Sequence, residues 1–223
     1  MLGGARRVVW HRTVGQDFAG NAGYLAREGY EPHILWDPTT GQLGQYIAAN
    51  LSGYALEHPS GTTQTNREGE VCIQIEVADH GQSWDITATK MLGWPSLRAW
   101  LASLGIPEVW PMGAPPALGC RNEAPVGTWM SSPGHYSHSQ VPANHHTDPG
   151  HMDLAVLFAG PHPHDPTTGD GSMSPQEIEA VAQRTYQLLH ADHAVMQHGD
   201  ANHIHALDHI GETVDAIAAK VGA

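Results

Sequence analysis

Cysteine, basic residues and long apolar runs are all scarce in this sequence. Its 223 residues include two cysteines, Cys72 and Cys120, which are too few for a disulfide framework, and the pattern does not say whether they pair. Lysine and arginine number 10 against 23 aspartates and glutamates, so the formal net charge is −13. Nucleic acids and anionic membranes bind cationic surfaces, and we therefore expect neither as a partner.

The sequence also has no apolar stretch long enough to span a bilayer, so we expect no membrane insertion. Residues 1–7 are not followed by the apolar core and cleavage site of a signal peptide. These features predict a soluble protein, made in the cytoplasm and not exported by the ordinary secretory route. The length and the 40% content of hydrophobic residues suit one good-sized globular domain with an appendage.

Histidine, in contrast, is plentiful, and its most informative cluster lies in residues 134–150. There His138 precedes Asp148 of an Asp-Pro-Gly turn by ten residues, and His145 and His146 stand between them. Imidazole and carboxylate groups are ligands of divalent metals, and zinc is the metal that most often takes them. A third ligand is needed, and His11, at the end of a short apolar run near the N-terminus, is the best candidate.

The abundance of histidine also favours a simpler interpretation. With 17 histidines in the chain, a histidine-rich stretch is expected by chance, and His11 alone is more typical of a surface or hydrogen-bonded core residue. Taken together with His138 and Asp148, it favours a metal site. Two imidazoles and one carboxylate leave a fourth position open for water, which is the pattern of a catalytic zinc site.

The spacing of apolar residues predicts the secondary structure. We expect strands at residues 8–11, 32–36, 43–47, 71–77 and 106–110, and helices at residues 21–28 and 95–104. Asp, Pro and Gly between the second and third strands predict a hairpin. Residues 49–69 are expected to form a surface loop and residues 111–133 to be irregular. The alternation of strands and helices predicts an α/β fold with a mixed central β-sheet flanked by helices.

Glu76 lies in the most regular of these strands. Every second residue from Val71 to Val77 is apolar, which places Glu76 and Gln74 together on the opposite face. A half-exposed glutamate on a solvated sheet face is the common outcome for such a residue. It becomes a functional candidate if that face carries the metal.

The composition changes after residue 159. Residues 160–173 are rich in Pro and Gly and predict a linker, and residues 174–223 predict a C-terminal helical hairpin that begins at a capping box at Ser174. Its apolar stripe from Ile204 to Val221 fits a core between two helices, a homo-oligomer seam or a binding face for a cell-surface polymer. We interpret the histidines of this region as lying on solvated helix faces rather than in a second metal site.

Taken together, the metal motif and its flanking segments resemble a known family. Residues 8–15, 65–67, 73–76, 137–142 and 147–150 are similar, in order and spacing, to segments of the zinc-dependent N-acetylmuramoyl-L-alanine amidases related to peptidoglycan recognition proteins, and particularly to phage endolysins. The resemblance covers residues 1 to about 155. It implies that residues 1–159 form a zinc amidase domain, that the fold is amidase-like, and that the partner is bacterial cell-wall peptidoglycan.

Residue by residue, the resemblance implies that His11, His138 and Asp148 bind Zn²⁺ and that Glu76 assists the attacking water. His146 stands where many members have a lysine, and we expect it to stabilise the oxyanion. Some members use a tyrosine at the start of the second strand, where this chain has Pro32 followed by His33. The bond cut would join N-acetylmuramic acid to L-alanine. The alternatives are a non-catalytic peptidoglycan-binding module of the same fold and a zinc peptidase that cuts within the stem peptide.

Overall fold

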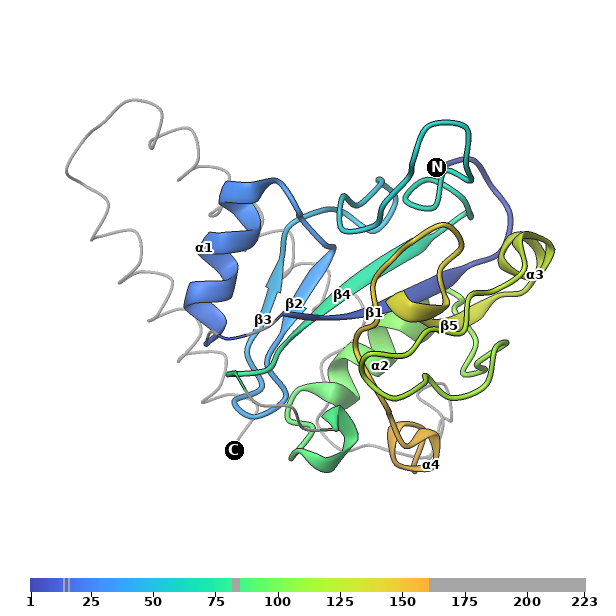
Figure 1. Ribbon diagram of the computed structural model, residues 1–223. Coiled ribbons are helices and arrows are strands. Elements are labelled where there is room, and N and C mark those ends of the chain that lie inside the picture. The colour runs from blue at the N-terminus through green and yellow to red at the C-terminus, as the bar shows by residue number, and fades with distance from the viewer. Residues whose placement is uncertain (14, 16, 82–84, 161–223) are drawn as a thin grey trace. The chain divides into compact units, whose positions relative to one another are not determined.

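The computed structural model describes residues 1–13, 15, 17–81 and 85–160. Five strands form one sheet in the order β3-β2-β4-β1-β5 (Figure 1). Their bounds are β1 Arg7–Thr13, β2 Ile34–Trp36, β3 Leu43–Gln45, β4 Cys72–Ala78 and β5 Gly134–Ser137. β3 is antiparallel to β2 and the other pairs are parallel, so the predicted mixed sheet and the β2–β3 hairpin are confirmed.

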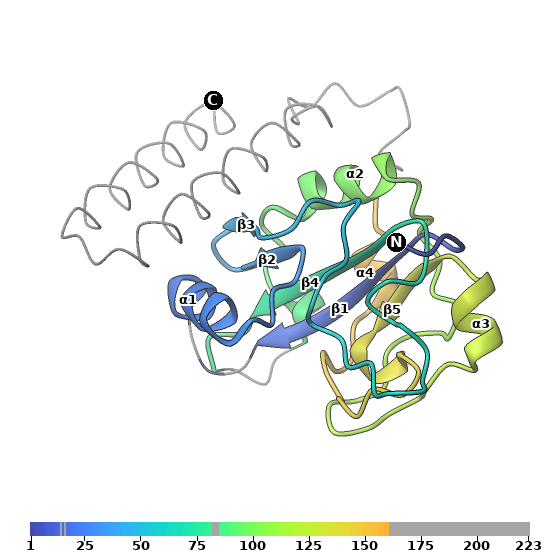
Figure 2. The same cartoon turned by 90° about the horizontal axis from the view of Figure 1, so that it is seen from above.

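The helices lie around this sheet and complete the predicted α/β class. Their bounds are α1 Phe18–Glu28, α2 Trp94–Ser103, α3 Val126–Ser131 and α4 Leu154–Leu157, with short 3₁₀ turns η1 Ile86–Ala88 and η2 His138–Gln140. Figure 2 shows α1 and α2 on opposite sides of the sheet. No helix in the described part of the chain is long and apolar enough to cross a membrane.

Tryptophans fill the face of the sheet that α2 covers. Trp94 of α2 packs against Trp10 of β1 and Trp36 of β2, with ring centroids 5.5 and 5.9 Å apart. The Trp94 indole N–H also donates to the carbonyl of Leu157 at 2.8 Å, which joins α4 to this layer. Because aromatic rings bury a large apolar area, this cluster anchors α2 to the two strands.

The opposite face of the sheet has two kinds of cover. Leu25 of α1 packs with Leu35 and Ala78 over one side. Over the other side, Leu56 from the loop between β3 and β4 packs with Val9 in a second buried cluster. The polarity of residues 49–69 predicted a surface loop. This expectation was only partly right, because part of the loop closes the core. Both faces of the parallel strands are buried, as is usual for such sheets.

Two further expectations were wrong. Residues 106–110 form no strand, and residues 111–133 contain α3. In addition, β5 was not predicted, and it begins the segment of residues 134–150 that carries the histidine cluster. The main chain at Val109 accepts one hydrogen bond from the His135 N–H at 2.8 Å and lies so close to Gly134 that a Cβ there would collide with the Val109 carbonyl oxygen. A single hydrogen bond places residues 106–110 beside β5 without making a ladder.

Both cysteines are free: Cys72 is buried in β4 and Cys120 is exposed. The predictions for residues 174–223, and for the linker beyond residue 160, lie outside the described residues.

Candidate metal centre

His11 and Glu76 face the same side of the sheet from the adjacent strands β1 and β4. They are register partners in the parallel β1–β4 pair. His11 lies inside β1 rather than at its end, since the strand continues to Thr13, and its side chain is buried. Residues of one register row project to one face, so the sheet itself places the imidazole beside the carboxyl group.

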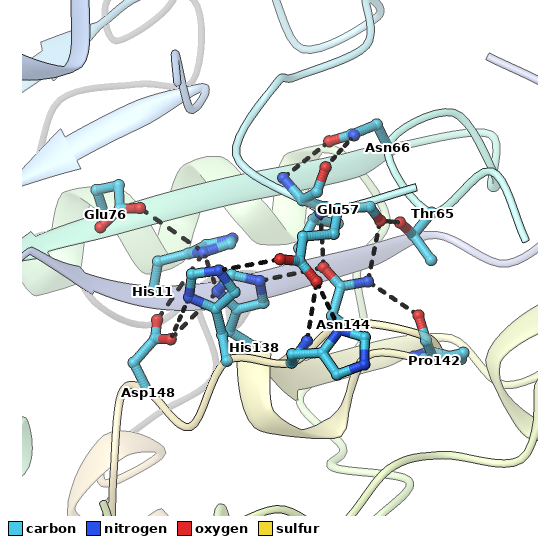
Figure 3. Close-up of polar contacts among 12 residues, drawn as sticks. His11, Glu57, Thr65, Asn66, Glu76, His138, Pro142, Asn144 and Asp148 are labelled. Carbon is cyan, nitrogen blue, oxygen red and sulfur yellow. Dashed lines mark hydrogen bonds and ion pairs between the residues drawn. The ribbon is translucent and has the colours of Figure 1, made fainter. Parts of the chain in front are cut away.

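The other two ligand candidates, His138 and Asp148, lie far from His11 in the sequence but beside it in the fold (Figure 3). His138 is the first residue of η2, directly after β5. Its Nδ1 lies 3.0 Å from Nδ1 of His11 and 3.2 Å from Oδ1 of Asp148. Oδ2 of Asp148 is 4.0 Å from Nδ1 of His11. The three side chains predicted as ligands therefore meet at one point.

These distances fit a shared metal ion. Ligand atoms about 2.0–2.1 Å from a tetrahedral metal stand roughly 3.3 Å from one another, which matches the two shorter separations. In the described part of the chain, His11, His138 and Asp148 are the one group of three such residues with ligand atoms all within 4.8 Å of one another. The site can hold a metal ion with two nitrogen ligands and one oxygen ligand.

The electrostatics of the site also suit a cation. Burial and the neighbouring His138 keep the pKa of His11 well below its usual value, so this imidazole is neutral. Burial alone would raise the pKa of Asp148, but the adjacent His138 and His11 lower it to about 2. A neutral imidazole and an ionised carboxylate are the forms that bind metals.

Asp148 is held in place by the strand that carries His11. The main-chain N–H of Arg12 donates to its Oδ2 at 3.1 Å. The Asp148 carbonyl accepts from the N–H of Ser139 at 3.0 Å, which closes the loop onto η2. Two ligands of the group are therefore fixed relative to one another by main-chain hydrogen bonds.

Glu76 lies beside the ligands without belonging to the closest group. Its Oε1 is 3.7 Å from Nδ1 of His11. The residue is 8% exposed, so the expectation of a half-exposed glutamate on a solvated face was wrong. Burial, together with the negative charge of Asp148, raises the pKa of Glu76 well above its usual value. Such a carboxyl group has a high affinity for a proton, as a general base requires.

His146 covers the outer side of the ligand group. Its ring stacks on that of His138 with centroids 4.2 Å apart and planes 8° apart. Its Nδ1 is 3.7 Å from Oδ1 of Asp148, its Nε2 is 3.7 Å from Oε1 of Glu57, and half of its side chain is exposed. Burial and His138 lower the pKa of His146. This imidazole is placed to meet a ligand that enters from solvent.

Comparison with family models, with curated proteins and with solved structures finds no match to this chain.

Two residues beside the centre carry no signal in the sequence. Asn144 is fully buried between His138 and the loop that precedes β4, and Glu57 lies on that loop. Oε2 of Glu57 accepts from the main-chain N–H of His145 at 3.0 Å and lies 3.1 Å from the His145 ring Nδ1. In the sequence, Glu57 is 87 residues from Asn144 and 88 residues from His145, so only the fold brings these groups together.

Proposed function

We propose that this protein is a zinc-dependent N-acetylmuramoyl-L-alanine amidase that hydrolyses bacterial peptidoglycan. The observation that carries the proposal is the convergence of His11, His138 and Asp148 at one point, with the buried carboxyl group of Glu76 next to them. The motif resemblance supplies the reaction and the substrate. It also supports an amidase-like fold for residues 1–159 and a phage endolysin that is made in the host cytoplasm.

Zinc is the proposed metal because two imidazoles and one carboxylate are a common ligand set of catalytic zinc sites. Zinc held by these residues supplies a Lewis acid for the scissile carbonyl and lowers the pKa of a water molecule to roughly 7.

Glu76 is the proposed proton carrier. Its carboxylate takes a proton from the attacking water and returns it to the nitrogen of the departing L-alanine, so that the amide becomes an acid and an amine. Its buried position beside His11 restricts competing solvent contacts. His146 is the proposed donor to the oxygen that becomes negative in the tetrahedral transition state.

The proposed partner is the cell wall, with no role for nucleic acid. A net charge of −13 disfavours binding to a polyanion.

Digestion of purified cell walls tests the proposal directly. The protein loaded with zinc should release new L-alanine amino termini, detected by end-group labelling and mass spectrometry. His11→Ala should lose both the bound zinc and this release, because it removes a ligand. His145→Ala is the matched control, since His145 is an exposed histidine of the same loop that contacts Glu57 rather than the ligand group.

The other outcomes would replace the proposal. Binding to walls without new amino termini would indicate a peptidoglycan-binding module. New termini at other residues of the stem peptide would indicate a zinc peptidase.

A further inference from the structure

Asn144 is fully buried, and its side-chain amide is surrounded by hydrogen-bond partners (Figure 3). Its Oδ1 accepts from the main-chain N–H of Glu57 at 2.7 Å. Its Nδ2 donates to the carbonyl oxygens of Glu57 at 3.1 Å and of Pro142 at 2.9 Å. The same Oδ1 lies 3.2 Å from Nε2 of His138.

The main-chain partners decide which way the amide of Asn144 points. A main-chain N–H can only donate and a main-chain carbonyl can only accept, so the oxygen of the amide must face Glu57 N–H, and with it His138. An amide oxygen only accepts hydrogen bonds. Nε2 of His138 must therefore carry a hydrogen. In the neutral imidazole this leaves the lone pair on Nδ1, the nitrogen that faces His11 and Asp148.

We propose that Asn144 is a positioning residue for the metal ligand His138. It selects the tautomer whose Nδ1 can bind a metal and fixes the plane of the ring from behind. Metal-binding histidines typically donate their second N–H to such a partner, and loss of that partner weakens metal binding. The inference rests on the metal centre of the proposed function and not on which bond the protein cuts.

His11 differs from His138 in this respect. Its Nε2 is buried and has no hydrogen-bond partner among the described residues. Of the two imidazoles, the described residues orient only His138 through its second nitrogen. The support of His138 by Asn144 is therefore specific to one ligand and is not a general feature of the pocket.

A purely structural role for Asn144 can be separated from this one, because the fold contains a close counterpart. Asn66 holds the adjacent residue in the same way: its Oδ1 accepts from the Leu56 N–H at 3.1 Å and its Nδ2 donates to the Leu56 carbonyl at 2.6 Å. The two asparagines thus clamp one short segment of main chain, but only Asn144 also contacts His138. Asn66→Ala is accordingly a matched control.

The first test is the affinity for zinc, measured by competition with a chelator. Asn144→Ala should weaken zinc binding by about 10- to 100-fold, while Asn66→Ala should stay within about threefold of the unmodified protein. Unchanged affinity in Asn144→Ala, or an equal loss in Asn66→Ala, would overturn the proposal.

The second test needs no variant. Nitrogen NMR of the metal-free, ¹⁵N-histidine-labelled protein reports which ring nitrogen of His138 carries the hydrogen. At a pH at which the ring is neutral we expect the hydrogen on Nε2, and a neutral ring with its hydrogen on Nδ1 would contradict the inference. Neither test uses peptidoglycan, so the proposed cleavage can fail while this assignment stands, and the reverse also holds.

Discussion

Glu76 combines two properties that a single side chain rarely has at a sheet centre. It is buried on a central strand, and it lies 3.7 Å from a metal-ligand candidate. Burial penalises the charged form of a carboxyl group, so a glutamate at this position lowers the stability of the fold. The proposed proton transfer explains why a glutamate stands here.

Glu76→Gln tests that role. Glutamine keeps the shape of the side chain but cannot take up a proton, so the zinc content should be unchanged while the rate of release of L-alanine termini falls by about 100-fold or more. The measurements are metal analysis and initial rates on purified walls. Glu70→Gln makes the same chemical change at an exposed ion pair with Arg6 and should leave the rate unchanged. A near-normal rate in Glu76→Gln would remove this residue from the mechanism.

At the scale of residues, the sequence predicted the candidate ligands but not the residues that support them. His11, His138 and Asp148 could be identified because metal ligands have characteristic residue types and spacing. Asn144 and Glu57 could not, since an amide and a surface carboxylate are common in loops. Their contacts depend on the packing of the loop before β4 against the loop after η2, which no local pattern encodes.

At the scale of elements, Trp94 attaches α2 to the sheet. Trp94 is 6% exposed, and its ring contacts Trp10 and Trp36 while its N–H reaches α4. Trp94→Ala should lower the free energy of unfolding by about 3–5 kcal/mol, because it removes a large buried ring and leaves a cavity. Denaturant titration at neutral pH would measure the change.

Val126→Ala serves as the comparison for this prediction. Val126 is 52% exposed in α3, and its truncation should change the free energy of unfolding by no more than about 0.5 kcal/mol. A loss in Trp94→Ala as small as this would mean that the tryptophan cluster does not anchor α2.

The elements with regular apolar spacing were predicted well. β1, β4, α1 and α2 all fall where periodicity placed them, with ends shifted by a few residues. β5 was missed because its sequence, Gly-His-Tyr-Ser, looks polar. Its side chains are nevertheless buried: His135 lies against Trp10 and Phe158, and Tyr136 lies against Trp129. Tertiary packing, and not local preference, makes this segment a strand.

The molecule as a whole should lose stability in mild acid. Burial lowers the pKa of His33 from 6.5 to about 4 and that of His135 from 6.5 to about 3. Between these values and 6.5 the unfolded chain binds protons that the folded chain does not, so stability is full above pH 6.5 and falls as the pH decreases. At pH 5 the loss should be roughly 2 kcal/mol for each histidine.

Unfolding free energies measured from pH 7 to pH 5 test this expectation. His33→Asn keeps an acceptor for the Gln74 N–H, which His33 Nδ1 provides in the fold, but it cannot be protonated. This variant should be less stable at neutral pH, and its pH slope should be shallower. An identical slope in both proteins would show that His33 does not contribute.

The separation of the ligands along the chain has a consequence for synthesis. His11 and His138 are 127 positions apart, and Asp148 follows later still. A nascent chain that ends at residue 130 contains one of the three ligand candidates, so it has no complete centre. The proposed hydrolase centre is therefore complete only after translation has passed Asp148 and β5 has joined the sheet beside β1.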